Sequence, residues 1–316
     1  MIVVVTLNPA IDVTYRVEEI TVGAEHRVIS EASKAGGKGI NVARVLNQLG
    51  CDCRVVGFVA GRNGEDISAD LESAEIESSL IDVAGESRRT VTVTSNDGRA
   101  TVFNEPGPTI SESDFLEMID VLSRTLTSSH PPDALVLTGS LPPGCPSEPY
   151  QTIGDLASAS LVPVVLDASG EALLSGARAR PALVKSNVNE LFLATGELDP
   201  RIGAASLLES GAQNVVVTLG RDGMICWSNL GSFQAVLNET VTGNPTGAGD
   251  AATALLAARL PMLLDSMLLD RDPGVWPDLL AHAVAVSASS LRCSTAGEID
   301  VAAYKSWIPL VEVSAL

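Results

Sequence analysis

One stretch decides most about this chain: Asn244-Pro245-Thr246-Gly247-Ala248-Gly249-Asp250. The next ten residues, Ala251 to Leu260, are rich in Ala and Leu and predict a helix. Gly247-Ala248-Gly249 would then present backbone N–H groups at the helix start, where the helix dipole also attracts anions. Asp250, in the first turn, could accept a proton from an attacking hydroxyl. A simple cap at Thr246, with Asp250 complementing the dipole, would explain the same residues, so the motif alone leaves both interpretations open.

A second glycine-rich segment, Ala35-Gly36-Gly37-Lys38-Gly39-Ile40-Asn41, also precedes a predicted helix. The apolar positions of that helix recur every third residue up to Leu49, and Gly50 stands where a C-terminal cap belongs. The segment lacks the spacing of a P-loop and of a dinucleotide-binding fingerprint. A flexible loop followed by a capped helix is the plain alternative. The chain has only four lysines, however, and Lys38 and Lys185 both fall inside the motifs singled out in this section.

With these motifs, the chain resembles the ribokinase-like (PfkB) sugar kinases, almost from end to end. Within that family, the Thr6-Leu7-Asn8-Pro9 opening and the Gly139-Ser140-Leu141-Pro142-Pro143-Gly144 loop resemble the 1-phosphofructokinase and tagatose-6-phosphate kinase branch. Each motif is weak alone, but eight in the family's order are specific. The eight segments are 6–12, 35–41, 85–88, 104–108, 139–144, 185–190, 218–220 and 247–250.

Length and composition agree with an α/β enzyme. The chain has 316 residues, 46% of them hydrophobic, which is enough for one large α/β domain or two small ones. The resemblance implies a single kinase domain over 1–316. Five cysteines without a CxxC pair predict buried, reduced thiols, and the short apolar run Ile2 to Leu7 predicts a core strand rather than a signal peptide. We therefore expect a cytoplasmic protein without a membrane partner.

The net charge of −19 argues against a nucleic-acid partner, because backbone phosphates are bound by clustered Lys and Arg. A protein this acidic must bind anionic substrates through local features: helix starts, a few arginines and a divalent cation.

Apolar strand-like runs alternate with helical patterns along the chain. This alternation predicts an α/β fold, a mostly parallel sheet with helices on both faces. The resemblance implies a ribokinase-like αβα sandwich. The predicted strands are Ile2 to Leu7, Arg54 to Val59, Ala134 to Thr138, Val162 to Asp167, Leu183 to Lys185 and Asn214 to Leu219.

Two insertions break this rhythm with half-exposed, hairpin-like alternation. One has predicted strands at Val13 to Val17 and Arg27 to Ser30, and the other at Thr90 to Thr94 and Arg99 to Phe103, around an Asp97-Gly98 turn. We expect them to form a small β-lid, from segments of about 13–34 and 88–104, as the resemblance implies. An extension of the edge of the main sheet is the alternative. A homodimer through the lid is a further expectation.

Binding residues are expected at the carboxyl ends of the parallel strands. Asp12, Ser140, Asn187 and Gly220 each follow a predicted strand. Asp12 could be a turn residue, and Asn187 with Glu190 matches an ordinary capping box. The resemblance nevertheless implies functional roles for these positions.

The roles that the resemblance implies fall into four groups: catalysis, substrate binding, nucleotide binding and metal binding. Asp250 is the catalytic base, with Gly247, Ala248 and Gly249 as the anion hole. Arg88 grips a sugar phosphate, although its neighbour Arg89 could do so instead. Glu190 holds Mg²⁺ through water. The other substrate-binding residues are Asp12, Gly37, Lys38, Asn41 and Ser140, and the nucleotide-binding residues are Lys185, Asn187, Thr218, Gly220 and Gly223.

We therefore expect an ATP- and Mg²⁺-dependent kinase that converts a ketohexose monophosphate to the 1,6-bisphosphate. Fructose 1-phosphate is the first choice of substrate and tagatose 6-phosphate the second. The alternative from another functional class is a catalytically idle sensor that binds a sugar phosphate. A dehydrogenase is a more distant alternative, because the dinucleotide-binding fingerprint is missing.

Overall fold

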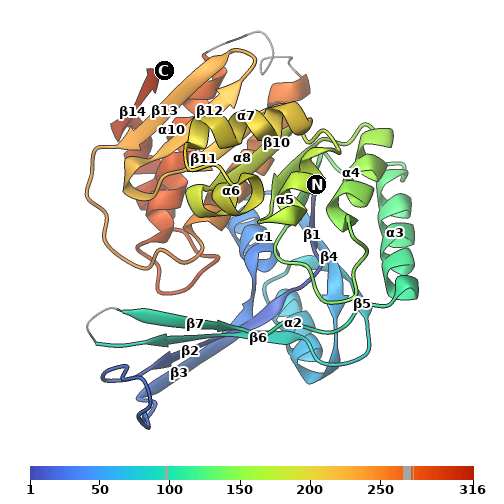
Figure 1. The fold of residues 1–316 in the computed structure, drawn as a ribbon, viewed down its shortest axis with the longest axis vertical. Helices are drawn as coiled ribbons and strands as arrows, with labels where there is room; N and C mark the ends of the chain where they lie inside the picture. The colour runs from blue at the N-terminus through green and yellow to red at the C-terminus, as the bar shows by residue number, and fades with distance from the viewer. Residues whose placement is uncertain (97–98, 266–271, 273) are drawn as a thin grey trace.

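A ten-stranded sheet forms the centre of the molecule in the computed structural model, which describes residues 1–96, 99–265, 272 and 274–316 (Figure 1). Its strand order is β14-β13-β12-β11-β10-β9-β8-β1-β4-β5, parallel from β11 to β5 and antiparallel from β11 to β14. The strands are β1 (Ile2–Thr6), β4 (Cys53–Val59), β5 (Glu77–Asp82), β8 (Ala134–Thr138), β9 (Val164–Asp167), β10 (Leu183–Asn187), β11 (Val215–Thr218), β12 (Met224–Ser228), β13 (Gly231–Leu237) and β14 (Val311–Ala315).

Two hydrophobic clusters cover the two faces of this sheet. Alternate residues of β1 show why: Ile2 and Val4 pack into one cluster, whereas Val3 and Val5 pack into the other. The first face carries α1 (Lys38–Gln48), α2 (Gly61–Ser73), α8 (Ala248–Asp265), α10 (Val275–Ser290) and α11 (Val301–Trp307). The second carries α3 (Glu112–Leu126), α4 (Pro149–Ala159), α5 (Glu171–Ala177), α6 (Val188–Thr195) and α7 (Pro200–Ser210). The predicted α/β architecture is confirmed.

The predicted strands of the main sheet fall where expected, with shifts of one or two residues. The most informative shift is in β10, which continues past Lys185 to Asn187, so Asn187 both ends the strand and caps α6. From β1, the chain adds β4 and β5 on one side of the sheet and then β8 and the later strands on the other side, so the strand order changes direction between β1 and β8. In open α/β sheets, ligands bind at such a change of direction.

The two insertions form a separate four-stranded sheet, with order β3-β2-β6-β7, and do not extend the main sheet. Its strands are β2 (Ala10–Arg16), β3 (Ser30–Gly36), β6 (Arg88–Thr94) and β7 (Ala100–Asn104). We call it the small sheet; it projects from the main body beside α1 and α2 (Figure 1). The predicted Asp97-Gly98 turn lies outside the described residues.

The strand predicted at Arg27 to Ser30 is wrong, because β3 begins only at Ser30 and runs to Gly36. Residues 17–29 form a longer connection, in which Val28 and Ile29 are 49% and 56% exposed. Both are β-branched residues, which are common in strands, and this favoured the prediction. The true register pairs Asp12 with Lys34 and therefore brings the glycine-rich segment beside β2.

Candidate active site

The turn before α8 has the backbone geometry that its glycines suggest. Gly247 has φ +87°, and a Cβ there would lie 2.9 Å from the Cβ of Ala296, so only glycine fits without displacement. The amide of Thr246 donates to Asn244 Oδ1 at 3.0 Å, so the side chain of Asn244 orders the turn. We call residues 244–249 the anion turn. Ala248 N–H donates to Pro245 O at 3.3 Å, so one of the three amides predicted to be free has an acceptor within the turn.

Asp250 lies in the first turn of α8 and is 7% exposed. Asn41 Nδ2, from the first turn of α1, donates to Asp250 Oδ2 at 2.8 Å. Burial, and then the nearby charge of Asp167, raise the pKa of Asp250 to about 6. A carboxylate stabilised by the helix dipole alone would be a weak base. The buried Asp250 is a stronger base than that, with a pKa nearer neutral pH.

Asp167, at the end of β9, is fully buried, and the sequence analysis did not select it as a site residue. It lies at the centre of a set of ion pairs that includes Lys38, Lys185 and Glu190, which we call the charged cluster. Its Oδ1 accepts from Lys38 Nζ at 2.9 Å, and its Oδ2 accepts from Lys185 Nζ at 3.0 Å and from Thr253 Oγ1 at 2.6 Å. Burial alone would raise the pKa of Asp167, but the two lysines outweigh it and hold the pKa well below the usual range. The signal available in the sequence was its position at a strand's carboxyl end, which it shares with the residues that were selected.

The two lysines of the motifs have different roles in the structure. Lys38 Nζ lies between Asp167 and Glu190, 2.6 Å from Glu190 Oε1. Burial would lower the pKa of Lys38, but Asp167, Glu190 and Asp250 raise it above its ordinary value, so Lys38 is a cation. Lys185, predicted to bind nucleotide, is 2% exposed and forms an ion pair with Asp167 in the core. A Cβ on Gly249 would lie 2.7 Å from Lys185 Nζ, so the start of α8 packs directly over this lysine.

The capping box at Asn187 and Glu190 is present and also reaches the charged cluster. Asn187 Oδ1 accepts from the amides of Asn189 and Glu190 at 2.9 Å, and Glu190 Oε2 accepts from the amide of Asn187. The second oxygen of Glu190 holds Lys38. Thr218, on β11, is directly paired with Asn187. The other two predicted nucleotide-binding residues, Gly220 and Gly223, flank the short turn after β11.

At the base of the small sheet, Asp12 and Arg88 lie side by side. Asp12 Oδ2 accepts from Gly37 N at 3.3 Å. Burial raises the pKa of Asp12, against the opposing effects of the Gly37 amide and Arg88. Arg88 donates from Nε to Asn8 O at 3.0 Å and from Nη1 to Thr90 Oγ1 at 3.2 Å, whereas the exposed Arg89 pairs with Glu105 at 3.1 Å. Of the two arginines, Arg88 is therefore the one beside Asp12 and Gly37.

Asn8, quoted in the opening motif but given no role, joins three loops at this end of the sheet. Its Nδ2 donates to Pro106 O at 3.0 Å and contacts Ser140 Oγ at 3.3 Å. Ser140 is thereby brought from the end of β8 to the end of β1, at the reversal in strand order. The residues predicted to bind substrate, to bind nucleotide and to catalyse the reaction thus lie together at the carboxyl ends of the parallel strands of the main sheet.

The family model of the pfkB family carbohydrate kinases matches residues 1–300. The chain belongs to this family. It is 35% identical to the 1-phosphofructokinase of Bacillus subtilis (strain 168) over 80% of this chain and 84% of the relative. It is 30% identical to the tagatose-6-phosphate kinase of Staphylococcus epidermidis (strain RP62A) over 82% and 85%. The structure of Escherichia coli phosphofructokinase-2 in complex with fructose-6-phosphate superposes with a TM-score of 0.83, at 25% identity and 98% coverage of both chains. The protein is a sugar-phosphate kinase.

Kinases of this family generally use ATP and Mg²⁺. Among the described residues, no group of three His, Cys, Asp or Glu side chains forms a metal cage. In proteins, Mg²⁺ is usually held by one or two carboxylates, water and substrate phosphates. Both carboxylate oxygens of Glu190 have partners in the structure, the amide of Asn187 and Lys38 Nζ, and its predicted role in holding Mg²⁺ through water stays a prediction.

Two observations concern the rest of the molecule. All five cysteines are free thiols, but only Cys53 and Cys226 are buried as predicted, whereas Cys51, Cys145 and Cys293 are partly exposed. Over the described part of the chain, no helix has both the length and the apolar character needed to cross a membrane.

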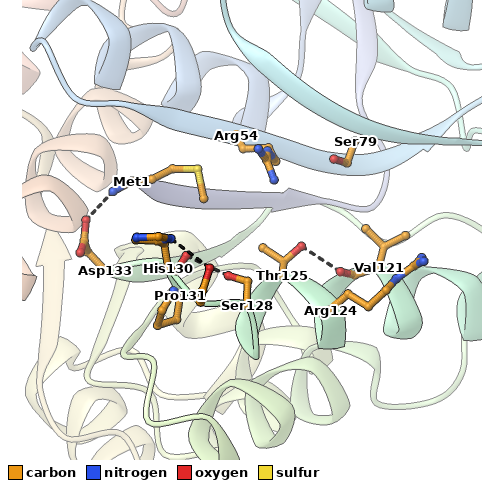
Figure 2. A pocket seen from close by; sticks show the side chains of 11 residues that line it. Met1, Arg54, Ser79, Val121, Arg124, Thr125, Ser128, His130, Pro131 and Asp133 are labelled. Atoms are coloured by element: carbon orange, nitrogen blue, oxygen red, sulfur yellow. Dashed lines mark hydrogen bonds and ion pairs between the residues drawn. The ribbon is translucent and has the colours of Figure 1, made fainter.

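A pocket of about 1090 Å³ lies at the opposite edge of the main sheet, where Met1, Arg54 and Asp133 mark the starts of β1, β4 and β8 (Figure 2). Its cations already have partners: Arg54 binds Glu77, and Arg124 binds Asp120. The pfkB motifs lie at the other edge, so we assign the pocket no part in the kinase reaction.

Proposed function

We propose that this kinase transfers the γ-phosphoryl group of ATP to fructose 1-phosphate, giving fructose 1,6-bisphosphate and ADP. The observation that carries the proposal is the buried Asp250, which directly follows the anion turn and accepts a hydrogen bond from Asn41. The 35% identity to a 1-phosphofructokinase supports the choice of sugar phosphate.

In the proposed reaction, Asp250 accepts the proton of the primary C6 hydroxyl as that oxygen bonds to the γ-phosphorus. The bond between the γ-phosphorus and the bridging oxygen breaks, and ADP leaves. Since Asn41 occupies one carboxylate oxygen of Asp250, the other can face the hydroxyl. Mg²⁺ bound with ATP neutralises phosphate charge, and the transition state is stabilised chiefly by positioning and electrostatics.

The phosphate already present on the substrate is assigned to Arg88, whose guanidinium suits bidentate binding of phosphate. Asp12, beside it, would accept hydrogen bonds from sugar hydroxyls. Nucleotide is assigned to the other side of Asp250, where Asn187 and Thr218 end the neighbouring strands β10 and β11 and Gly220 begins the short turn after β11.

Tagatose 6-phosphate is the second candidate, because a tagatose-6-phosphate kinase is 30% identical to this chain. It also carries a phosphate at one end and a primary hydroxyl at the other, so the same residues could bind it with the sugar reversed.

The test is a panel of sugars with ATP and Mg²⁺, read by ADP formation: fructose 1-phosphate, tagatose 6-phosphate, fructose 6-phosphate and unphosphorylated fructose. We expect the highest kcat/KM with fructose 1-phosphate and the lowest with fructose. A higher kcat/KM with either other sugar phosphate would overturn the choice of substrate. Equal use of fructose would overturn the phosphate-binding role of Arg88.

A further inference from the structure

Lys34 connects the small sheet to a segment far away in the sequence. It lies on β3, directly opposite Asp12 of β2. Its Nζ donates to the backbone oxygen of Ala296 at 2.6 Å, and the carboxylate of Glu298 is further away, at 3.6 Å. The Lys34 side chain is only 22% exposed, so this contact is partly shielded from water.

The segment that Lys34 holds, residues 294–299, packs against two parts of the catalytic site. A Cβ on Gly247 of the anion turn would lie 2.9 Å from the Cβ of Ala296. A Cβ on Gly297 would lie 3.1 Å from Oδ1 of Asn41, the residue that holds Asp250. Asn244 of the anion turn also donates from Nδ2 to Ser294 O at 3.2 Å.

We propose that Lys34 is a positioning residue that fixes the small sheet, with its substrate-binding Asp12, relative to the anion turn and Asp250. This inference rests on the proposed function, because it assumes that the small sheet binds the acceptor sugar. A displacement of one ångström between acceptor and base is enough to lower turnover strongly. Lys34 needs no contact with substrate to have this effect.

The test compares Lys34→Met, which keeps the unbranched apolar stem of the side chain but removes the donor, with Lys34→Arg, which keeps a donor. Glu298→Gln is the matched control, because it removes the weaker ion pair and leaves the Ala296 contact intact. We expect Lys34→Met to lower kcat with fructose 1-phosphate about tenfold, with a change in the KM for ATP of less than twofold. Lys34→Arg should recover most of the loss, and Glu298→Gln should stay within about twofold of the wild type.

A second readout does not depend on turnover. If Lys34 ties the two regions, Lys34→Met should speed amide exchange both in β3 and in residues 244–250, with little change elsewhere. Wild-type kcat in Lys34→Met, or an equal loss in Glu298→Gln, would overturn the proposal, as would faster exchange in β3 alone. If the wild-type protein turned over no fructose 1-phosphate, the proposed substrate would be wrong, and the exchange experiment would still decide the role of Lys34.

Discussion

The anion turn with α8 and the small sheet contribute to the same site from opposite environments. Asp250 and Asp167 are buried among lysines, Asn41 and Thr253, and their pKa values are displaced in opposite directions. All five residues of β7, in contrast, are exposed, and the buried residues of the small sheet lie toward its base: Ala10, Ile11 and Val13 of β2, and Ala35 and Gly36 of β3. Buried charges are tuned by their neighbours, whereas an exposed sheet can move without unpacking a core. We infer that the core supplies the chemistry and the small sheet supplies recognition.

The strongest test of this division is Asp250→Asn. The substitution should lower kcat roughly 10²- to 10⁴-fold, the usual contribution of a general base, with nearly unchanged binding of ATP and sugar phosphate. Steady-state kinetics and equilibrium binding would measure both effects. Turnover within threefold of the wild type would refute the role of Asp250 as the general base.

Stability provides the control for that variant. Burial raises the pKa of Asp250, so the folded state binds this proton more tightly than the unfolded state does. The contribution of Asp250 to stability is therefore lost as pH rises from the ordinary value of 3.8 to about 6. Above pH 6, Asp250→Asn should melt no lower than the wild type, and a lower Tm would point to a structural cause for lost turnover.

On the recognition side, Arg88→Ala should raise the KM for the sugar phosphate about 30-fold, equivalent to about 2 kcal/mol for a charge-assisted bidentate contact. The KM for ATP should change little. Arg89→Ala is the matched control, since Arg89 is exposed and pairs with Glu105. If Arg89→Ala gave the larger increase, the assignment of the two arginines would be reversed.

The pH dependence of kcat should separate the two regions further. Because the ionised form of Asp250 is the base, kcat should fall about tenfold per unit below a pKa of about 6 and level off above it. Arg88→Ala should keep this profile, because Arg88 acts on binding. A wild-type profile that is flat between pH 5 and 8 would contradict the raised pKa.

The smallest expected effect is on the motion of the small sheet. Binding of fructose 1-phosphate should slow amide exchange several-fold in β2 and β6, which carry Asp12 and Arg88. The buried β1 is the internal reference. Equal exchange with and without substrate, at saturation verified by calorimetry, would indicate a static sheet.

Much of the site was accessible from the sequence because its residues belong to short motifs at the ends of predictable strands. Asp250, Asn187 and Ser140 lie where the alternation of strands and helices places them. The error at β3 arose because the exposed Val28 and Ile29 imitate a strand, and only pairing with β2 selects residues 30–36. The contact of Lys185 with Asp167 was missed for a related reason: β10 continues past Lys185, and the sequence does not reveal which buried partner its side chain meets.

The sequence by itself determined the family, six strands of the main sheet and the residue types needed for phosphoryl transfer, because these depend on local pattern and spacing. The strands β5, β12, β13 and β14 of the main sheet were not predicted. Only the tertiary structure decided which charges meet. Asp167, Lys38 and Lys185 are separated by up to 147 residues yet share one buried cluster, since β9 and β10 end and α1 begins at the same edge of the sheet. The raised pKa of Asp250 follows from that convergence. The contacts of Arg88 with Asn8 and of Lys34 with Ala296 likewise join segments far apart in the sequence, which no local pattern specifies.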